Sequence, residues 1–284
     1  MLVSPIASAA AAATQPELTA GSGALEFTRV GRRTVLTRAL AVSPLKVLNP
    51  GHAGASAWAY LATYGGGLVG GDALDVQVTV RRGATALLAT QASTKVYRSP
   101  VGAQHTLRAE VADGGLLMVL PDPVTCFAGS SYRQQQRIRL EAGANLVLVD
   151  RLTAGRVESG ERWLFDEYVA RTLIWRADSL LLHEALQLTR DDGDLARRLD
   201  RFNALAFIVL LGPALAGTAA HLARIVESAA VERRADCLLS AAQLGEDGAI
   251  LRVASPSVEQ LSAMVRQRLH GVTSLLGDDP WIGK

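Results

Sequence analysis

The chain has 284 residues, of which 49% are hydrophobic and 20% charged, and its formal net charge is +2 at pH 7. This composition is typical of a globular protein with a sizeable core, and the small net charge favours neither nucleic acid nor a membrane surface as a partner. The two cysteines have no CxxC spacing, which excludes a disulfide scaffold and a zinc knuckle and indicates a reducing compartment, the cytoplasm. No apolar run reaches about 18 residues, so the sequence predicts no transmembrane helix.

The N-terminal segment, residues 1–20, is rich in alanine and lacks the basic start and long apolar stretch of a signal peptide. We interpret it as a disordered tail, with a short extra helix as the alternative. The rest contains no low-complexity linker. We therefore expect one domain over residues 21–284, with a β-rich part (21–211) and a C-terminal α/β part (212–284).

Alternating apolar residues and turn signals predict strands near the start of this domain. Leu25 and Phe27 alternate with polar neighbours, and a turn at Gly31 leads into Thr34–Leu40, a pattern typical of a hairpin. Two further strands are predicted at Leu45–Leu48 and Ala57–Thr63.

Three later stretches share one pattern, which is a strand, a charged residue, a glycine turn and an apolar strand. Their turn glycines, Gly83, Gly114 and Gly143, lie about 30 residues apart, a spacing typical of structural repeats. In the first copy, Leu74–Val80 alternates between apolar and polar residues. The second strands of the copies are predicted at Ala84–Thr90, Leu116–Leu120 and Asn145–Asp150. The spacing predicts stacked sheets, although hairpins in a β-sandwich share the pattern.

More strands and a short helix follow the repeats. The strands are predicted at Trp163–Ile174 and Leu180–Leu188, and the helix at Leu195–Arg201. The apolar run Ala204–Leu211 is too short and too β-branched for a helix.

The C-terminal part predicts two helices on either side of a hairpin. The first follows Pro213 and has Leu222 and Val226 at helical spacing, and the hairpin joins Cys237–Leu239 to Ala249–Val253. The second helix is expected to have Ser255 as its N-cap, Pro256 at its first position and Gly271 at its end. The fold class is therefore mainly β, with stacked sheets and two C-terminal α-helices.

Five glycines fall within the seven residues Gly65–Gly71. The spacing of Gly65, Gly67 and Gly70 matches a dinucleotide-binding fingerprint, but that fingerprint needs a helix after its last glycine. Here Asp72 leads into an alternating strand, and no Gly-Lys-Ser/Thr of a P-loop follows. We expect a glycine-rich bulge or a close approach of two backbones within a sheet.

Several polar residues near this block have two interpretations. Asp72 is either a turn aspartate or a carboxylate open to a ligand or cation. Lys95 and Tyr97 share one face of a predicted strand that continues to Arg98. They form either an acid–base pair or a buried polar network, and we favour the network.

No arrangement of residues predicts an enzyme or a preformed metal site. Cys126 has no local base, and the five histidines show no ligand spacing. Glu161 and Glu184 lie on strand-like segments, where a salt bridge or an exposed polar face is the usual outcome. There is no Gly-x-Ser-x-Gly motif.

The block "GGGLVGGD" at Gly65–Asp72, followed by "TQASTKVYRS" at Thr90–Ser99, closely resembles the urease accessory protein family UreD, also called UreH. Further matches are "LPDPVTCF" at Leu120–Phe127, "YRQ" at Tyr132–Gln134 and "SGERW" at Ser159–Trp163. The resemblance covers the chain from about Gly21 to its end. It implies strands stacked in a helix-like arrangement with two helices.

The resemblance also implies a function. UreD proteins are not enzymes; with UreF they recruit the GTPase UreG to the urease apoprotein and help nickel reach its active site. Nickel is then a cargo in transit, with no tightly bound cofactor. Carried over to this sequence, the transient nickel contacts are Asp72, Glu161 and Glu184, and the passage or structural residues are Thr94, Lys95, Tyr97 and Arg98. The alternatives are a β-module that binds a non-metal ligand and a nucleotide-dependent enzyme.

Overall fold

The computed structural model describes residues 19–281 except 53, 231 and 233. The predicted tail, residues 1–20, lies outside the described residues except for its last two positions. The first strands are β1 (Ser22–Val30), β2 (Arg33–Ala41), β3 (Leu45–Leu48), β4 (Ala57–Thr63), β5 (Ala73–Val80), β6 (Thr85–Thr90), β7 (Thr94–Val96), β8 (Ala103–Val111) and β9 (Leu116–Leu120). The later strands are β10 (Val124–Cys126), β11 (Ser131–Leu140), β12 (Asn145–Thr153), β13 (Glu167–Arg176), β14 (Ser179–Thr189), β15 (Ala204–Leu211), β16 (Leu238–Leu244) and β17 (Gly248–Ser255). The α-helices are α1 (Leu195–Arg198), α2 (Ala216–Ser228) and α3 (Val258–Thr273).

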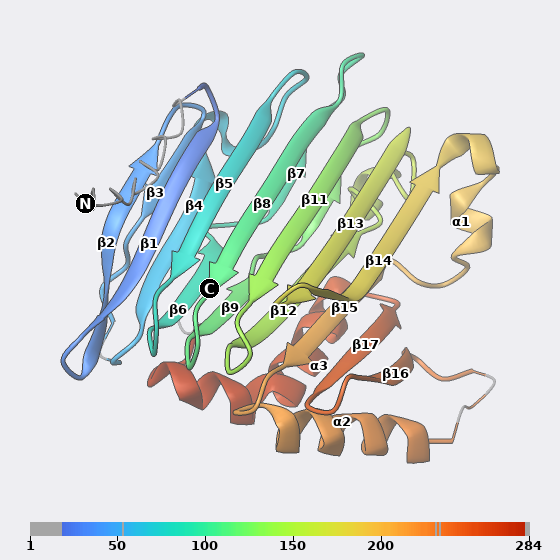
Figure 1. Ribbon diagram of the computed structural model, residues 1–284. Coiled ribbons are helices and arrows are strands. Elements are labelled where there is room, and N and C mark those ends of the chain that lie inside the picture. The colour runs from blue at the N-terminus through green and yellow to red at the C-terminus, as the bar shows by residue number, and fades with distance from the viewer. Residues whose placement is uncertain (1–18, 53, 231, 233, 282–284) are drawn as a thin grey trace, which may run out of the picture.

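The strands form two sheets packed face to face (Figure 1). Sheet A has the order β14-β13-β11-β8-β5-β1-β2, and sheet B has the order β16-β17-β15-β12-β9-β6-β4-β3. The short strands β7 and β10 pair with each other at the side of sheet B. The fold is mainly β, as the sequence predicts.

The three repeats stack on one another and alternate between the sheets. Each copy places its first strand in sheet A (β5, β8 or β11) and its second in sheet B (β6, β9 or β12), and equivalent strands pair in parallel. The predicted helix-like stack is therefore confirmed. The strand–turn–strand units are not hairpins, because the turn at Gly83 carries the chain across the core to the other sheet. Only this crossing lets both strands of a copy bury an apolar face in one core.

Two apolar layers result. The inner layer lies between the sheets and includes Val76, Leu107 and Leu148. The outer layer lies between sheet B and the helices α2 and α3, and includes Val149 and Leu269. Strand β12 serves both layers, because its side chains alternate between the two faces of sheet B.

Helices α2 and α3 cover the outer face of sheet B (Figure 1), and their predicted apolar stripes are buried. The predicted N-cap is wrong: Ser255 ends β17, and the Ser257 hydroxyl accepts the N–H of Gln260 at 3.2 Å. The predicted end of α3 is also wrong, since Gly271 remains helical and the helix runs to Thr273. The left-handed glycine comes later, at Gly277, after a final 3-10 turn.

One predicted strand starts too early. The run Trp163–Ile174 becomes a strand only at Glu167, because Trp163 has a φ of 56° and belongs to an irregular loop. The Trp163 indole is buried and donates a hydrogen bond of 2.9 Å to the carbonyl of Phe202. The burial of this ring therefore depends on a loop contact distant in sequence.

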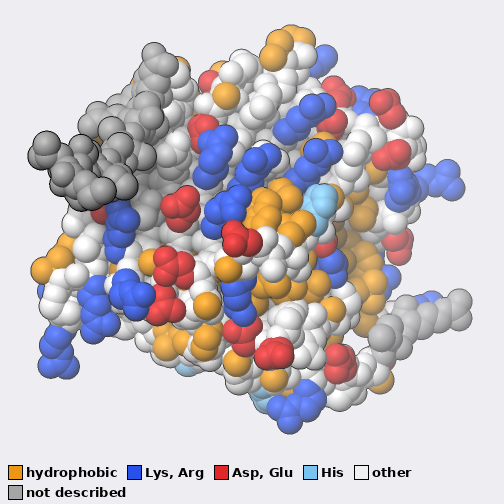
Figure 2. All heavy atoms as spheres, in the orientation of Figure 1, with side chains coloured by type: hydrophobic (Ala, Val, Ile, Leu, Met, Phe, Trp, Pro, Cys, Tyr) orange, Lys and Arg blue, Asp and Glu red, His pale blue; other side chains and the backbone are white. Residues whose placement is uncertain are grey.

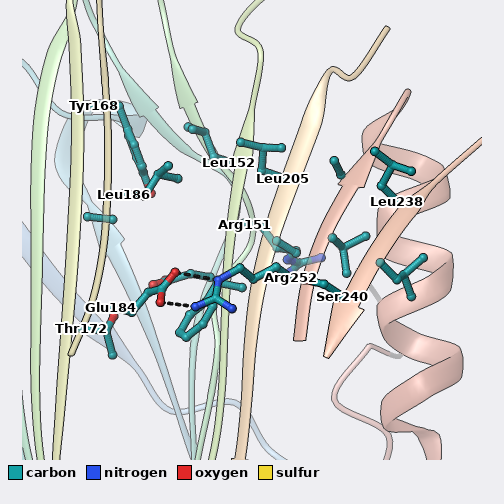
Figure 3. A pocket seen from close by; sticks show the side chains of 17 residues that line it. Arg151, Leu152, Tyr168, Thr172, Glu184, Leu186, Leu205, Leu238, Ser240 and Arg252 are labelled. Carbon is teal, nitrogen blue, oxygen red and sulfur yellow. Dashed lines mark hydrogen bonds and ion pairs between the residues drawn. The ribbon is translucent and has the colours of Figure 1, made fainter. Parts of the chain in front are cut away.

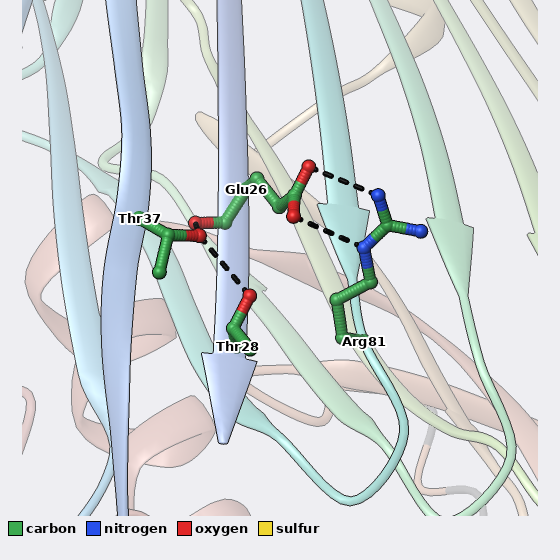
Figure 4. Close-up of polar contacts among 4 residues, drawn as sticks. All are labelled: Glu26, Thr28, Thr37 and Arg81. Atoms are coloured by element: carbon green, nitrogen blue, oxygen red, sulfur yellow. Dashed lines mark hydrogen bonds and ion pairs between the residues drawn. The ribbon is translucent and has the colours of Figure 1, made fainter. Parts of the chain in front are cut away.

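The outer face of sheet A carries charges of both signs, with hydrophobic side chains among them (Figure 2). Arg81 donates two hydrogen bonds of 3.1 Å to Glu26, next to a 3.0 Å contact between the Thr28 and Thr37 hydroxyls (Figure 4). These hydrogen bonds lower the pKa of Glu26. Such exposed pairs each contribute about 1 kcal/mol or less, so this face is held mainly by its strand pairing. None of the described helices has the length and apolar content to span a bilayer.

Candidate functional site

The motifs that carry the family resemblance gather at one end of the stack. Gly65–Asp72, Thr90–Ser99, Leu120–Phe127 and Ser159–Trp163 each lie shortly before a sheet A strand, namely β5, β8, β11 and β13. These four strands are parallel, so their starts share one edge of the sheet. We call this edge the loop end, and the opposite edge, with the tight turns, the turn end.

The glycine block lies against the second motif at the loop end. The Leu68 N–H donates to the Lys95 carbonyl at 2.8 Å, and the Tyr97 N–H donates to the Leu68 carbonyl at 2.9 Å. A β-carbon on Gly67 would lie 2.5 Å from the Tyr97 ring, and one on Gly70 would collide with Ser99. The predicted close approach of two backbones is confirmed. The block leads into β5 and not into a helix, so the arrangement of a dinucleotide cradle is absent from this block.

Asp72 is a turn residue at the loop end. Its carboxylate accepts the N–H of Val69 at 2.9 Å, and its own N–H donates to the Val69 carbonyl at 3.1 Å. It does not line the interior cavities described below. Its contact with nickel stays a prediction.

The second motif divides between the interior and the surface. Thr94 borders the interior, whereas Lys95 and Arg98 are exposed. The half-buried Tyr97 packs edge-on against Phe127, with 5.1 Å between ring centroids. The favoured interpretation of a buried polar network is wrong for Lys95, because the alternation along β7 directs Val96 into the core and leaves Lys95 exposed.

Glu161 is part of an ion pair at the loop end. Arg156 donates to both of its carboxylate oxygens, and the Ala128 N–H donates at 3.2 Å. These contacts, the Arg156 hydrogen bonds first, lower the pKa of Glu161. The Arg156 guanidinium also lies 4.3 Å from the centroid of the Phe127 ring. Glu161 does not line the interior cavities described below, and its contact with nickel stays a prediction.

Glu184 faces the interior from β14 and meets sheet B there. Arg252 on β17 donates from Nε to Glu184 Oε1 at 2.9 Å and from Nη2 to Oε2 at 2.5 Å (Figure 3). The pair bridges the two sheets at the wall of a cavity of about 480 Å³. Glu184 therefore forms a salt bridge, one of the two usual outcomes expected from the sequence.

Three cavities lie between the sheets. The groove cavity, of about 480 Å³, is bordered by β12–β17 and contains Glu184 and Arg252 in its wall. The glycine cavity, of about 100 Å³, lies beneath Gly66 and Gly67. The middle cavity, of about 40 Å³, has room for about one water molecule.

The cavities share walls. Asp150 and Arg151 border both the groove cavity and the middle cavity. Residues that border both the middle and the glycine cavity are Leu61, Thr90, Thr94, His105 and Tyr132. The series therefore runs from the glycine block at the loop end to the Glu184–Arg252 pair.

Asp150 is the carboxylate at the centre of this series. Gln134 donates to it at 2.9 Å and Gln136 at 2.8 and 2.7 Å, so these hydrogen-bond partners are neutral amides. Burial raises the pKa of Asp150 to about 6, against the lowering effect of the amides. At neutral pH the group is a carboxylate held in a low-dielectric interior, which attracts a cation more strongly than a surface carboxylate does.

His105 and Tyr132 extend the polar wall toward the loop end. Burial lowers the pKa of His105 to about 4, so its imidazole is neutral at pH 7 and does not repel a cation. Its Nε2 has no hydrogen-bond partner within the described part of the chain. The Tyr132 hydroxyl donates to Gln134 Oε1 at 3.4 Å. Carboxylate, amide, hydroxyl and imidazole groups suit a divalent cation that keeps part of its water shell.

Strand register aligns these groups into rows. On sheet A, neighbouring positions on the inner face read Val76, Leu107, Gln136, Thr172 and Glu184. On sheet B, Asp150 is beside Phe207, and Phe207 is beside Arg252. The inner layer therefore becomes polar toward β14 and β17.

Sequence reasoning missed Asp150, Gln134, Gln136 and His105. A signal was present, because period-two alternation places Gln134 and Gln136 on the same face of β11 as Ile138. Likewise Asp150 shares its face of β12 with Leu148 and Leu152. Polar side chains on an otherwise apolar strand face mark a functional or structural polar cluster.

No group of three or more His, Cys, Asp or Glu side chains suited to a metal ion occurs within residues 19–281 outside positions 53, 231 and 233. Cys126 is buried, which raises its pKa to about 12 and leaves the thiol protonated. A thiolate ligand or nucleophile at this position is therefore disfavoured.

Comparison with known proteins agrees with the motifs. A family model described as UreD urease accessory protein matches residues 19–281. The chain is 50% identical to the urease accessory protein UreD of Sorangium cellulosum over 265 residues, which span 93% of this chain and 84% of that protein. It is 44% identical to the UreD of an Anaeromyxobacter species, over 93% of this chain and 89% of that protein. It is 32% identical to urease accessory protein D of Arabidopsis thaliana, over 92% and 99% of the two chains.

Proposed function

The chain belongs to the UreD family of urease accessory proteins, and we propose that it serves urease maturation by passing nickel through the interior of its β-stack. Family membership gives the role in maturation. The passage, the partners and the cargo are the proposal. The chain acts in the cytoplasm as a non-catalytic scaffold that, with UreF, recruits the GTPase UreG to the urease apoprotein.

The observation that carries the passage is the row of three cavities with Asp150 at its centre. A cation in transit needs oxygen groups and water rather than a closed cage of His and Cys ligands, which would retain it. Asp150, the two glutamines and Thr94 provide such groups along the shared walls. The middle cavity is the narrowest point, so passage there requires local movement or partial dehydration of the ion.

The passage is tested by urease activation at limiting nickel with Asp150→Asn. We expect activation to fall several-fold while UreF still co-purifies, because the interior loses its negative charge but keeps hydrogen-bond acceptors. Asp75→Asn, on the outer face of sheet A, is the control and is expected to activate normally. Full activation with Asp150→Asn would refute the passage.

The loop-end carboxylates allow a second comparison. If Asp72 and Glu161 contact nickel before it enters, their alanine variants will reduce activation while UreF binding survives. Unchanged urease activation in both variants would show that neither Asp72 nor Glu161 contacts nickel on its way into the passage. The role in maturation itself predicts that deletion of the gene prevents full urease activation at limiting nickel.

A second candidate function is binding of a small apolar ligand in the groove cavity. The observation in its favour is a wall composed mainly of apolar residues, including Leu186, Leu205 and Phe207. Titration with a hydrophobic fluorescent dye, with and without Leu186→Arg, measures this binding. Dye binding that Leu186→Arg abolishes, together with normal activation by that variant, would favour a ligand site over an ion route.

A further inference from the structure

Two ion pairs of this chain are nearly identical in their local structure but differ in their surroundings. In both, an arginine donates from Nε and Nη2 to the two oxygens of a glutamate. The exposed fractions of the arginine and glutamate side chains are 47% and 20% for Arg156–Glu161, and 46% and 22% for Arg252–Glu184. Each guanidinium also lies over a phenylalanine ring. Only the second pair lines the groove cavity.

The pairing with Arg252 weakens the attraction of the Glu184 carboxylate for a cation. Both of its oxygens accept hydrogen bonds from Arg252, and the positive charge of the guanidinium offsets the negative charge of the carboxylate. The same hydrogen bonds raise the pKa of Arg252, so the guanidinium stays charged. A divalent ion at this wall therefore meets a neutral pair rather than a free carboxylate.

The Arg252–Glu184 pair lies at the groove cavity, where a masked carboxylate affects cation binding. Figure 3 shows Arg252 extending from sheet B toward Glu184 on sheet A, across the groove cavity that Asp150 borders at its inner side. We propose that Arg252 gates the groove cavity: its guanidinium keeps Glu184 from binding a divalent cation until it is withdrawn. This gate rests on the proposed passage. Within that passage, Arg252 is the residue that determines whether the groove cavity binds a divalent cation.

Withdrawal of Arg252 is energetically accessible. Nearly half of its side chain is exposed, and ion pairs with this exposure contribute little to stability. A second ion pair, between Arg176 on β13 and Asp247 in the turn between β16 and β17, is more buried, with exposed fractions of 21% and 17%. The sheets remain packed when Arg252 moves, because the apolar inner layer between them does not include this guanidinium.

The test measures Ni²⁺ binding to the full-length chain by isothermal titration calorimetry. Arg252→Gln frees Glu184 and is expected to tighten Ni²⁺ binding on the order of tenfold. Arg252→Lys, which keeps the charge but loses the two-pronged geometry, is expected to show a smaller gain. Arg81→Gln, which frees Glu26 on the outer face of sheet A, is the control and is expected to leave binding unchanged, as is Arg252→Gln combined with Glu184→Gln.

The gate is overturned if Arg252→Gln and Arg252→Lys both bind Ni²⁺ as the unmodified chain does. It is also overturned if Arg81→Gln gives an equal gain, because any unmasked surface glutamate then suffices, or if the gain persists without Glu184. Circular dichroism of each variant verifies folding, and Arg252→Lys carries the test if Arg252→Gln does not fold. The passage fails separately, when Asp150→Asn leaves urease activation unchanged.

Discussion

The outer and the inner layer of this molecule share sheet B but differ in chemistry. The outer layer, between sheet B and helices α2 and α3, is a continuous apolar core. The inner layer has an equally apolar part around Val76 and Leu148, then a polar part with three cavities, two of which Asp150 borders. The outer layer and the apolar part of the inner layer therefore provide most of the apolar burial that stabilises the fold, whereas the polar part contains a buried carboxylate that needs hydrogen-bond partners.

The largest expected effect lies in the outer layer. Leu269 on α3 is fully buried, so Leu269→Ala removes apolar contacts and leaves a cavity. We expect the free energy of unfolding to fall by about 2 to 5 kcal/mol. Urea unfolding measures it, and a loss below about 1 kcal/mol would contradict the assignment of stability to this layer.

A smaller loss is expected when the polar cluster is left incomplete. Gln136→Leu removes the hydrogen bonds from Gln136 to Asp150 and leaves a buried carboxylate with one amide partner, at a cost of about 1 to 3 kcal/mol at pH 8. The cost should shrink at pH 5, because protonation of Asp150 removes the charge. Gln135→Leu, on the outer face of β11, is the control, with an expected change within about 0.5 kcal/mol. Equal losses for Gln136→Leu at both pH values would contradict this explanation.

Asp150→Asn is expected to stabilise the protein at pH 8. The folded-state pKa of Asp150, about 6, is raised above the ordinary value of 3.8, so ionisation of this group costs stability as the pH rises from about 4 to 6. Asparagine has no such cost, and we expect a gain of about 1 to 2 kcal/mol at pH 8 and none at pH 4. This is less than the full pKa shift implies, because Asp150 also borders an open cavity. Urea unfolding at pH 8 and pH 4 measures this gain in the free energy of unfolding. A destabilised variant at pH 8 would show that the carboxylate supports the fold.

The smallest effect is expected on the exposed side of the helices. A β-carbon on Gly217 in α2 would have no atom within 4 Å, and its φ is not positive. Gly217→Ala should therefore stabilise the protein by about 0.5 to 1 kcal/mol through helix propensity alone. Thermal unfolding detects this gain. Gly67→Ala provides the contrast, since its β-carbon would collide with Tyr97 and should destabilise.

Local patterns predicted most of the secondary structure. Period-two alternation located β1, β2 and β5, and helical spacing located α2 and α3, because these patterns depend on side-chain direction within one element. The repeated glycine turns predicted the stack of parallel copies. Boundaries failed where distant contacts decided them, as at Trp163, whose loop conformation depends on Phe202.

The sequence predicted only some of the residues of the candidate site. The motifs named Thr94, and the wider family resemblance named Glu184; both residues border the interior cavities. The same motifs named Asp72 and Glu161, which form local turn and ion-pair contacts at the loop end. Asp150 carried no local motif, and its importance follows from β11 facing β12 across the inner layer.

The sequence by itself determined the strands, the repeats and the family, since strands and repeats are encoded within about 30 neighbouring residues and the family in short contiguous motifs. The tertiary structure alone decided which carboxylates are free and which are paired. Arg252 masks Glu184 from 68 residues away in the chain, and Gln134 and Gln136 hold Asp150 across the sandwich. Charge at a site depends on distances in space, and no periodicity along the chain specifies which arginine will reach which glutamate.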